Sequence, residues 1–451
     1  MIYNHPNMKY SLLKPSLIVL LLFLGHASNA QIKKWTIQEC VDYALKNNIS
    51  IKQSELDLKI SDIEKLEAIG NFTPSVTASA NYGINTGANI NPATNQFENE
   101  TFKSASANLN SGVNLFNGLV NWKNLQRVKL NKLANTYRLD KMKDDIALSV
   151  ANSYLQILFN KEQIKVLVNQ NKITKENLVR TAELIQAGTI PFGDIYDLRA
   201  SDATQEQQII NAENTLMISK LALAQTLLLK EYANFDVADE DMDIPPTAIL
   251  VQSPEAIAIK AKEVVNDLKI ANSNLEIAKK DVEISKTSFL PSLSGFVGYN
   301  TRWSQSIPIG FMDQLSFFDG TNLGIQLNVP ILNGFASRGR VQRSKINQER
   351  TKLLLEQSEL DLERTVFQAY NDLKNAKSAY DAALKTADAR KLSQDFSKER
   401  YSVGLLNSFD YSQALLTYEN AQSEVLRAKY DYIFKIKLVE FYFGIPIIQK
   451  Q

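Results

Sequence analysis

Two periods of apolar residues alternate along this chain. In 36–69 and again in 255–288, apolar residues recur at steps of three and four, as in Ile37, Cys40, Val41 and Ala44. This spacing predicts one amphipathic helix in each segment. Apolar and polar residues then alternate strictly, which predicts strands of membrane-spanning length at 74–85, 104–116, 291–303 and 321–332. The segments between paired strands, 86–103 and 304–320, are rich in Asn, Gly, Thr and Pro and are predicted to be exposed loops.

The helical period returns after Gly118 and Gly334. The segments 118–187 and 334–403 contain no proline, and Gly339 is the one glycine within them beyond the starting residue. At 1.5 Å per residue, each predicted helix is roughly 100 Å long. Amphipathic helices of this length need partners along their sides, so coiled-coil packing is expected. Turns at 188–193 and 404–409 are then predicted to lead into returning helices at 194–230 and 410–443.

The two halves of the chain resemble each other. A shift of 216 residues aligns Gln126-Arg127 with Gln342-Arg343, and it aligns Gly188 and Asp194 with Gly404 and Asp410. Upstream, Phe72-x-Pro74-Ser75 matches Phe289-x-Pro291-Ser292 at a shift of 217. We therefore predict two tandem repeats, 31–230 and 255–444, joined by a linker or equatorial segment at 231–254 and followed by a tail at 445–451.

Residues 1–30 have the order of a secretory signal peptide. Lys9 and Lys14 precede an apolar run at 16–24, and Ser28 and Ala30 stand at the −3 and −1 positions of a cleavage site. The apolar run is too short to span a bilayer. The sequence therefore predicts export, with residues 1–30 removed.

Charge and residue usage exclude several classes of function. The chain has 50 Lys and Arg residues, and 48 remain when Lys9 and Lys14 are removed with the leader. These nearly balance the 49 Asp and Glu residues, so no nucleic-acid partner is expected. Both histidines, His5 and His26, lie in the leader, and Cys40 is the one cysteine. Triad-type enzymes and histidine zinc sites are therefore excluded, and we predict no enzyme activity, no metal and no cofactor.

The single cysteine and one acidic cluster have simple structural explanations. Cys40 falls in the apolar spacing of its helix and is predicted to be buried. The acidic cluster from Asp239 to Asp243 could bind a cation, but its spacing lacks the pattern of an EF-hand, and a solvated linker is favoured.

Four strands per chain cannot close a membrane barrel. An open edge in lipid leaves backbone groups unpaired, at a cost of several kcal/mol each. Two chains would supply eight strands and three would supply twelve. An eight-stranded barrel is filled by its own side chains, whereas a larger one leaves a lumen. The pattern therefore indicates an oligomeric barrel that continues into a helical tunnel.

Four segments resemble, in order, the motifs of the TolC family of outer-membrane efflux proteins. They are Trp35–Asn48, Phe289–Leu293, Val329–Gly334, and Arg400–Gly404 with Asp410 after it. The resemblance implies an α+β membrane protein that forms a homotrimer. A twelve-stranded β-barrel, with four strands per chain, would contact outer-membrane lipid and continue into a coiled-coil periplasmic tunnel. It further implies docking to a periplasmic adaptor (membrane fusion) protein and an inner-membrane RND or ABC transporter of a Gram-negative bacterium.

The resemblance also assigns roles to the hairpin tips. There, Asp410 and its repeat counterpart Asp194 would line a constricted pore entrance, and Tyr401 would donate a hydrogen bond to the carboxylate of Asp194. The chain departs from the family pattern at Leu406, in place of a basic residue, and at Gln413, in place of a second carboxylate that Asp197 supplies in the first repeat. Alternatively, Asp194 and Asp410 are N-caps of their helices, and the two roles are compatible.

The expected function is the exit duct of a tripartite efflux pump that carries small molecules out of the cell. Two alternatives stay open at this point. The chain could be the exit duct of a type I protein secretion system, or a structural coiled-coil protein of the periplasm. The sequence specifies neither the cargo nor the partner pump.

Overall fold

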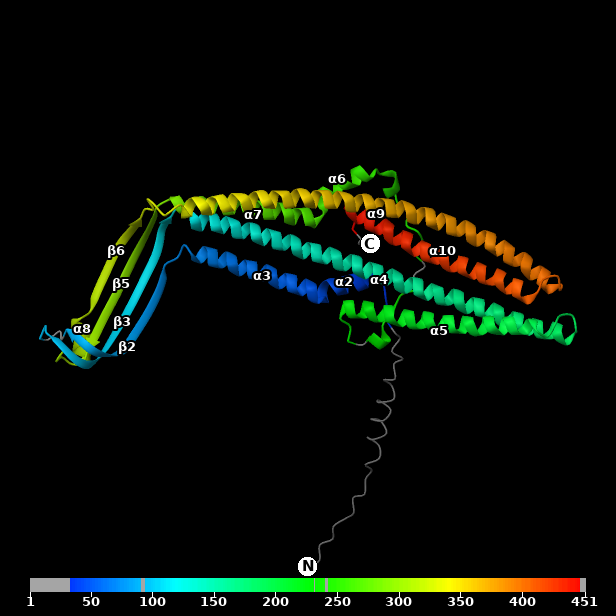
Figure 1. The fold of residues 1–451 in the computed structure, drawn as a ribbon, viewed down its shortest axis with the longest axis horizontal. Coiled ribbons are helices and arrows are strands. Elements are labelled where there is room, and N and C mark those ends of the chain that lie inside the picture. Colours follow the sequence, from blue (N-terminus) through cyan, green and yellow to red (C-terminus); the bar gives the residue numbers. More distant parts are fainter. Residues whose placement is uncertain (1–32, 91–93, 231, 240–241, 447–451) are drawn as a thin grey trace, which may run out of the picture.

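The chain forms an elongated molecule with a sheet at one end and two helical hairpins at the other (Figure 1). The computed structural model describes residues 33–90, 94–230, 232–239 and 242–446. The predicted signal peptide and residues 447–451 of the predicted tail lie outside the described residues. No helix in the described ranges is long enough and apolar enough to cross a membrane.

Four antiparallel strands form the sheet in the order β2-β3-β5-β6. They are β2 (Ser75–Ile90), β3 (Phe97–Asn117), β5 (Ser292–Ser304) and β6 (Gly320–Asn328). The prediction of a loop over 86–103 was wrong, because β2 and β3 extend into it and stay paired from Ser75 with Gly112 to Ile90 with Phe97. The predicted loop at 304–320 contains a short helix, α8 (Phe311–Phe317). β6 ends before Pro330, which has no N–H to donate to a ladder.

The strand register gathers most of the apolar side chains of the four strands on one face of the sheet, with Phe296 on the other. Directly paired residues of antiparallel strands share a face. One row across the sheet is Ala78, Leu109, Tyr299 and Thr321, and its neighbour is Val76, Ser111, Val297 and Leu323. The opposite face holds rows of polar residues and glycine, such as Thr77, Asn110, Gly298 and Asn322. The sheet therefore has one apolar and one polar face.

Four helices continue from the sheet as a layer. They are α3 (Ile49–Gly70), α4 (Val120–Gln186), α7 (Asn266–Lys286) and α9 (Ala336–Ser402). Within the layer α3 packs on α4, α4 on α7, and α7 on α9, so α3 and α9 are the outermost helices (Figure 1). Further from the sheet, α5 (Asp194–Leu227) returns along α4, and α10 (Ser408–Phe443) returns along α9.

Both helices predicted to precede the strands are divided in two, and in this respect the predictions were wrong. Asn48 separates α2 (Ile37–Asn47) from α3, because its extended backbone ends one helix while its side chain caps the next. Its Nδ2 also donates to the carbonyl of Thr226 in α5, at 3.1 Å. In the second half, the buried and extended Val265 separates α6 (Pro254–Val264) from α7.

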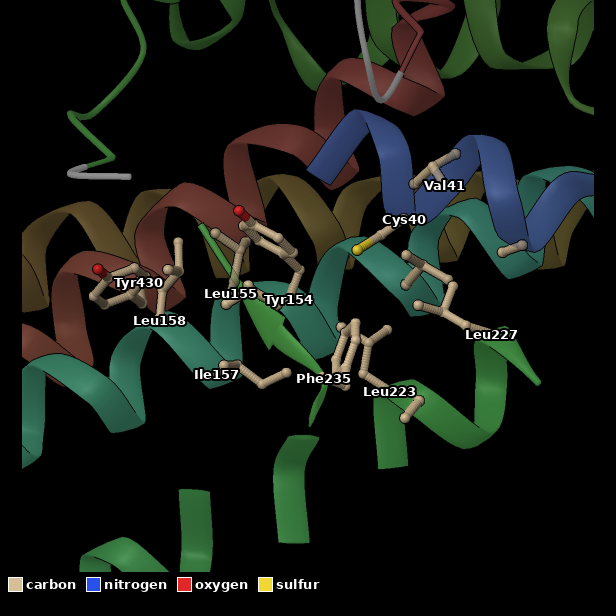
Figure 2. Close-up of a cluster of buried hydrophobic side chains, with 14 of the residues drawn as sticks. Cys40, Val41, Tyr154, Leu155, Ile157, Leu158, Leu223, Leu227, Phe235 and Tyr430 are labelled. Atoms are coloured by element: carbon tan, nitrogen blue, oxygen red, sulfur yellow. The ribbon is translucent and has the colours of Figure 1, made fainter. Parts of the chain in front are cut away.

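The two halves contain the same elements in the same order. Each has a short helix, a helix that leads to the sheet, two strands, a helix of 67 residues and a returning helix of 34 or 36 residues. Each half also has an apolar core where the short helix meets the long one. The first core includes Val41, Tyr154, Leu223 and Phe235 around the fully buried Cys40, as predicted for this cysteine (Figure 2). The second core is built around Ile257, Val366, Leu373 and Ile436.

The connection between the halves is tied to the helices at some of its acidic residues. Of the cluster predicted to be solvated, Asp243 is exposed, Glu240 and Asp241 lie outside the described residues, and Asp239 forms ion pairs while its side chain stays 42% exposed. The strand β4 (Asp236–Val237) of this connection pairs with β1 (Lys34–Trp35). Asp236 forms an ion pair with Lys161 at 2.9 Å. Asp239 pairs with Lys161 at 2.6 Å and also with Lys34, and these bonds lower the pKa of Asp239 to about 2. The acidic side chains thus fasten the connection to α4.

Candidate pore entrance at the hairpin tips

Two tight turns close the hairpins at the end furthest from the sheet (Figure 1). Gly188 and Gly404 have φ angles of 71° and 76°, a left-handed conformation that glycine adopts without steric cost. The amide of Thr189 donates to the carbonyl of Leu184 at 3.0 Å, and the equivalent bond in the second turn measures 2.9 Å. This pattern is the Schellman motif, so both long helices end at their glycines by the same local chemistry.

The predicted carboxylates stand in the first turns of the returning helices. Asp194 is the first residue of α5, with Asp197 one turn on, and Asp410 is the third residue of α10. The N-cap residues are Gly193 and Asn407, so the hypothesis that Asp194 and Asp410 are themselves N-caps was wrong. The Oδ1 of Asn407 accepts from the amide of Asp410 at 2.8 Å, and its Nδ2 donates to the Asp410 carboxylate at 3.0 Å. Negative charge at these positions interacts favourably with the helix dipoles.

Tyr401 is buried between the hairpins, and its hydroxyl pairs with Thr181 Oγ1 at 2.7 Å. Its ring stacks on Tyr411 with 4.9 Å between centroids and 5° between planes. Asn177 Nδ2 donates to the Tyr411 hydroxyl at 2.9 Å. The expected bond from Tyr401 to Asp194 is therefore wrong for this protomer, because Thr181 takes its place. Burial raises the pKa of the Tyr401 hydroxyl, so it stays protonated.

The two returning helices also contact each other. Ser408 Oγ donates to Asp197 Oδ2 at 3.3 Å, which joins the first turns of α5 and α10. About two turns further along α5 and three turns further along α10, Gln205 Nε2 donates to Glu419 Oε1 at 2.9 Å. A cavity of about 290 Å³ lies between α5 and α10, and Asp197, Gln205 and Glu419 help to line it. The structure thus brings Asp197 into a polar contact between the hairpins.

Glu419 is a functional candidate that sequence reasoning missed. Its side chain is only 5% exposed, and burial raises the pKa of its carboxyl group to about 7, although the bond from Gln205 acts in the opposite direction. The sequence does contain a signal. Tyr411, Leu415 and Glu419 follow each other at steps of four, which places a carboxylate in the buried stripe of α10.

The interior of the bundle becomes polar toward the tips. On α4 the residues at successive steps of four, three and four are Gln170, Thr174, Asn177 and Thr181, and all four are buried. Such steps mark the seam of a coiled coil, where apolar residues are usual. Gln170 Oε1 and Thr174 Oγ1 have no hydrogen-bond partner among the described residues. Each such atom costs about 1–3 kcal/mol. The tip half is therefore held together less firmly than the apolar cores.

Comparison with known proteins agrees with this architecture. The sequence profile of the outer membrane efflux protein family matches residues 40–227 and 260–434. The chain is 22% identical over 310 residues to the outer membrane protein TolC of Escherichia coli (strain K12), an alignment that covers 66% of this chain and 60% of TolC. It is 20% identical over 277 residues to protein CyaE of Bordetella pertussis, covering 58% of this chain and 54% of CyaE.

The crystal structure of the Campylobacter jejuni CmeC outer membrane channel shares the fold. It has a TM-score of 0.72 and 19% sequence identity, and the comparison covers 98% of this chain and 94% of CmeC. The chain spans less than two thirds of the length of the curated relatives it matches.

The four-stranded sheet that continues into long helical hairpins places the chain in the fold class to which the CmeC outer membrane channel also belongs. Within this class, the chain belongs to the outer membrane efflux protein family.

Proposed function

We propose that this protein is the outer-membrane exit duct of a tripartite efflux pump and works as a homotrimer. In this proposal the sheet spans the outer membrane and the helices form a tunnel in the periplasm. The hairpin tips face a periplasmic adaptor protein, which connects the duct to an inner-membrane RND or ABC transporter. Membership of the outer membrane efflux protein family supports the proposal.

The observation that carries the proposal is the separation of polar and apolar residues on the sheet. Along β6, the apolar Leu323, Ile325 and Leu327 alternate with the polar Asn322 and Gln326. The register continues both sets across the other strands. A strand that faces lipid on one side and water on the other needs this alternation. A soluble hairpin with both faces in water would not be stabilised by so many exposed aliphatic side chains.

The free edges of the sheet support assembly with further copies. β2 and β6 are the outermost strands, and an unpaired strand edge in lipid is costly. Each copy can pair its β6 with β2 of the next copy, so that a closed ring removes all edges. Three copies give twelve strands, which leaves a lumen lined by the polar face.

The tips supply the features that an entrance to the duct needs. Asp194, Asp197 and Asp410 concentrate negative charge at the openings of the hairpins, and in a trimer each would appear three times. The pair of Tyr401 and Thr181 joins α9 to α4, and the pair of Ser408 and Asp197 joins α10 to α5. We propose that these bonds hold the closed arrangement and that adaptor docking favours the open one.

Genetic complementation tests the proposed function. Deleting the gene in its host should increase sensitivity to small toxic compounds, and plasmid-borne protein should restore resistance. The matched control is Leu327→Lys, which places a charge on the apolar face and should fail to restore resistance, whereas Gln326→Lys on the polar face should succeed. Unchanged sensitivity after deletion, together with loss of a secreted protein, would instead indicate a secretion duct.

A further inference from the structure

The starts of α4 and α9, directly after the sheet, combine exposed apolar residues with tryptophan or arginine. In the second half, Ile331, Leu332 and Phe335 are 93%, 89% and 74% exposed. Arg338 follows within one turn and is also exposed. At the shift of 216 residues its counterpart in the first half is Trp122, which is 56% exposed. Tryptophan is enriched at the interface between membrane and water, and arginine attracts anionic lipids, so both halves carry an interfacial residue type at the same position.

Trp122 lies on neither of the sides by which α4 contacts its neighbours in the layer. α4 forms ion pairs with α3 through Lys132 and with α7 through Lys123. At 3.6 residues per turn, Trp122 is about 80–100° away from each of these lysines around the helix. Leu133, which is 41% exposed, comes about three turns after Trp122 and shares its side, whereas Asn124 lies on the opposite side. Next to the sheet, α4 therefore has one free apolar side and one free polar side.

These two free sides match the two faces of the sheet. At the end of β3, which leads into α4, Phe116 belongs to the apolar face and Asn117 to the polar face. In the proposed duct the sheet and the helices form one continuous wall, and its polar face lines the lumen. The side of α4 that holds Asn124 then faces the lumen. The side that holds Trp122 faces outward, at the level where the apolar residues of the sheet end.

The basic residues on the outward side lack acidic partners within the chain. Lys129 lies two turns after Trp122 on the same side of α4, and its counterpart on α9 is Lys345. Both lysines are exposed, as is Arg338. None of the three forms an ion pair with any residue that the structure describes. The first 20 residues of α4 and the first 13 of α9 contain no Asp or Glu, so their own helices offer no counter-charge.

The direction of the helices brings these basic side chains closer to the sheet. α4 and α9 both begin next to the sheet (Figure 1), and side chains of a helix lean toward its N-terminus. Arg338 is the third residue of α9. Positive charge at this end of a helix interacts unfavourably with the helix dipole, so Arg338 does not serve to stabilise α9. An anionic layer beside the start of the helix would offset this cost.

We infer that Arg338, Lys129 and Lys345 bind the phosphate groups of anionic phospholipids in the periplasmic leaflet of the outer membrane, with the ring of Trp122 inserted beside them. The inference rests on the proposed function and adds the class of lipid that surrounds the duct on its periplasmic side. Three basic residues from each of three protomers form a belt of nine positive charges. A phospholipid leaflet fits this belt better than a protein does, because the belt directly follows the apolar residues that end at Phe335 and recurs around the whole trimer.

Titration of the purified trimer with single lipids tests the inference. Native mass spectrometry gives dissociation constants for phosphatidylglycerol, which is anionic, and for phosphatidylethanolamine, which has no net charge. Phosphatidylglycerol should bind roughly five-fold more tightly. The combined variant Arg338→Gln, Lys129→Gln and Lys345→Gln should remain a trimer and lose this preference. Lys385→Gln is the matched control, because it removes an exposed charge of α9 far from the sheet, and it should keep the preference. Equal affinity of the native protein for both lipids would overturn the inference.

Quenching of Trp122 fluorescence locates the lipid independently. Trp303→Phe protein in vesicles of phosphatidylglycerol with brominated acyl chains should be quenched, and adding Trp122→Phe should remove most of the quenching. Trp35 is present in both variants as an equal background, since it packs against the first apolar core. Quenching of Trp122 by acrylamide in the water but not by brominated lipid would place it in the lumen and overturn the inference. A stable trimer that fails both tests refutes this lipid contact alone, whereas a protein that never trimerises refutes the proposed function.

Discussion

Replacing Glu419 by glutamine should stabilise the tip half of the protein at alkaline pH but not at acidic pH. Burial raises the pKa of this carboxyl group from its ordinary value of 4.5 to about 7. Between pH 4.5 and pH 7, the carboxyl group of Glu419 is therefore protonated in the folded state and ionised in the unfolded state. Stability is then full below about pH 4.5 and decreases as the pH rises toward 7. Above pH 7 the carboxylate is ionised in both states, and its burial lowers the free energy of unfolding by a constant amount.

The size of the effect follows from the shift of the pKa. A shift of one unit corresponds to about 1.4 kcal/mol, so ionisation of Glu419 costs on the order of 3 kcal/mol at pH 8. Glutamine has the same shape and no charge, and its amide can still hydrogen-bond with Gln205. Glu419→Gln should therefore recover most of this free energy at pH 8 and close to none at pH 4.5.

Hydrogen exchange of the backbone amides in 411–423 measures this effect where it occurs. With exchange rates corrected for their intrinsic pH dependence, the native protein should show less protection at pH 8 than at pH 5, and the variant should show equal protection at both. Glu424→Gln is the control, because Glu424 is exposed and paired with Arg427 in the same helix. Equal protection of the native protein at both pH values would refute the reasoning.

The remaining predictions concern the sheet and the entrance. Leu327→Lys should lower the trimer yield in detergent, since a charge at mid-membrane costs about 2–4 kcal/mol, and Gln326→Lys should not; equal yields would contradict a membrane strand. Tyr401→Phe and Thr181→Val should each raise single-channel conductance in planar bilayers, because each removes the same bond of about 1 kcal/mol, and combining them should add little. If Tyr401→Phe alone has this effect, the bond to Thr181 is not what holds the entrance. Asp410→Ala should reduce cation selectivity, measured as the reversal potential in a salt gradient, and an unchanged reversal potential would exclude a charge ring at this position.

Local signals in the sequence predicted much of the fold. Gly188 and Gly404 mark the hairpin turns. Each long helix ends there in a residue with positive φ, a conformation that glycine tolerates. The alternation along each strand predicted one apolar face, and the register then aligned these faces across four strands. These features depend on neighbouring residues, so a pattern along the chain is sufficient to find them.

Features that depend on distant contacts could not be predicted. The helical pattern continues through Asn48, where the structure has a break, and the Asn48 side chain is also held by a bond to Thr226, which is 178 residues away in sequence. The loop predicted at 86–103 has a composition typical of turns, yet pairing between strands, as between the hydroxyls of Thr86 and Thr101, extends the hairpin through most of it.

In the candidate site, too, features set by local sequence were predictable and features set by distant contacts were not. The positions of Asp194, Asp197 and Asp410 after the turns were predictable, because a short interval from each glycine fixes them. The partner of Tyr401 was not, because Thr181 is a common residue 220 positions away with no signal of its own. Long-range polar pairs of this kind are decided by packing that the sequence pattern does not record.

The equal lengths of α4 and α9 set the length of the helical part of the protein. Both have 67 residues, or about 100 Å at 1.5 Å per residue. Both start at the sheet and end at the same end of the molecule (Figure 1), so an insertion in one helix alone would push one tip past the other. A change of span requires matched changes in both hairpins, in steps of seven residues that keep the same faces in contact. The length of the helical part is therefore set in both halves of the chain, and each half constrains the other.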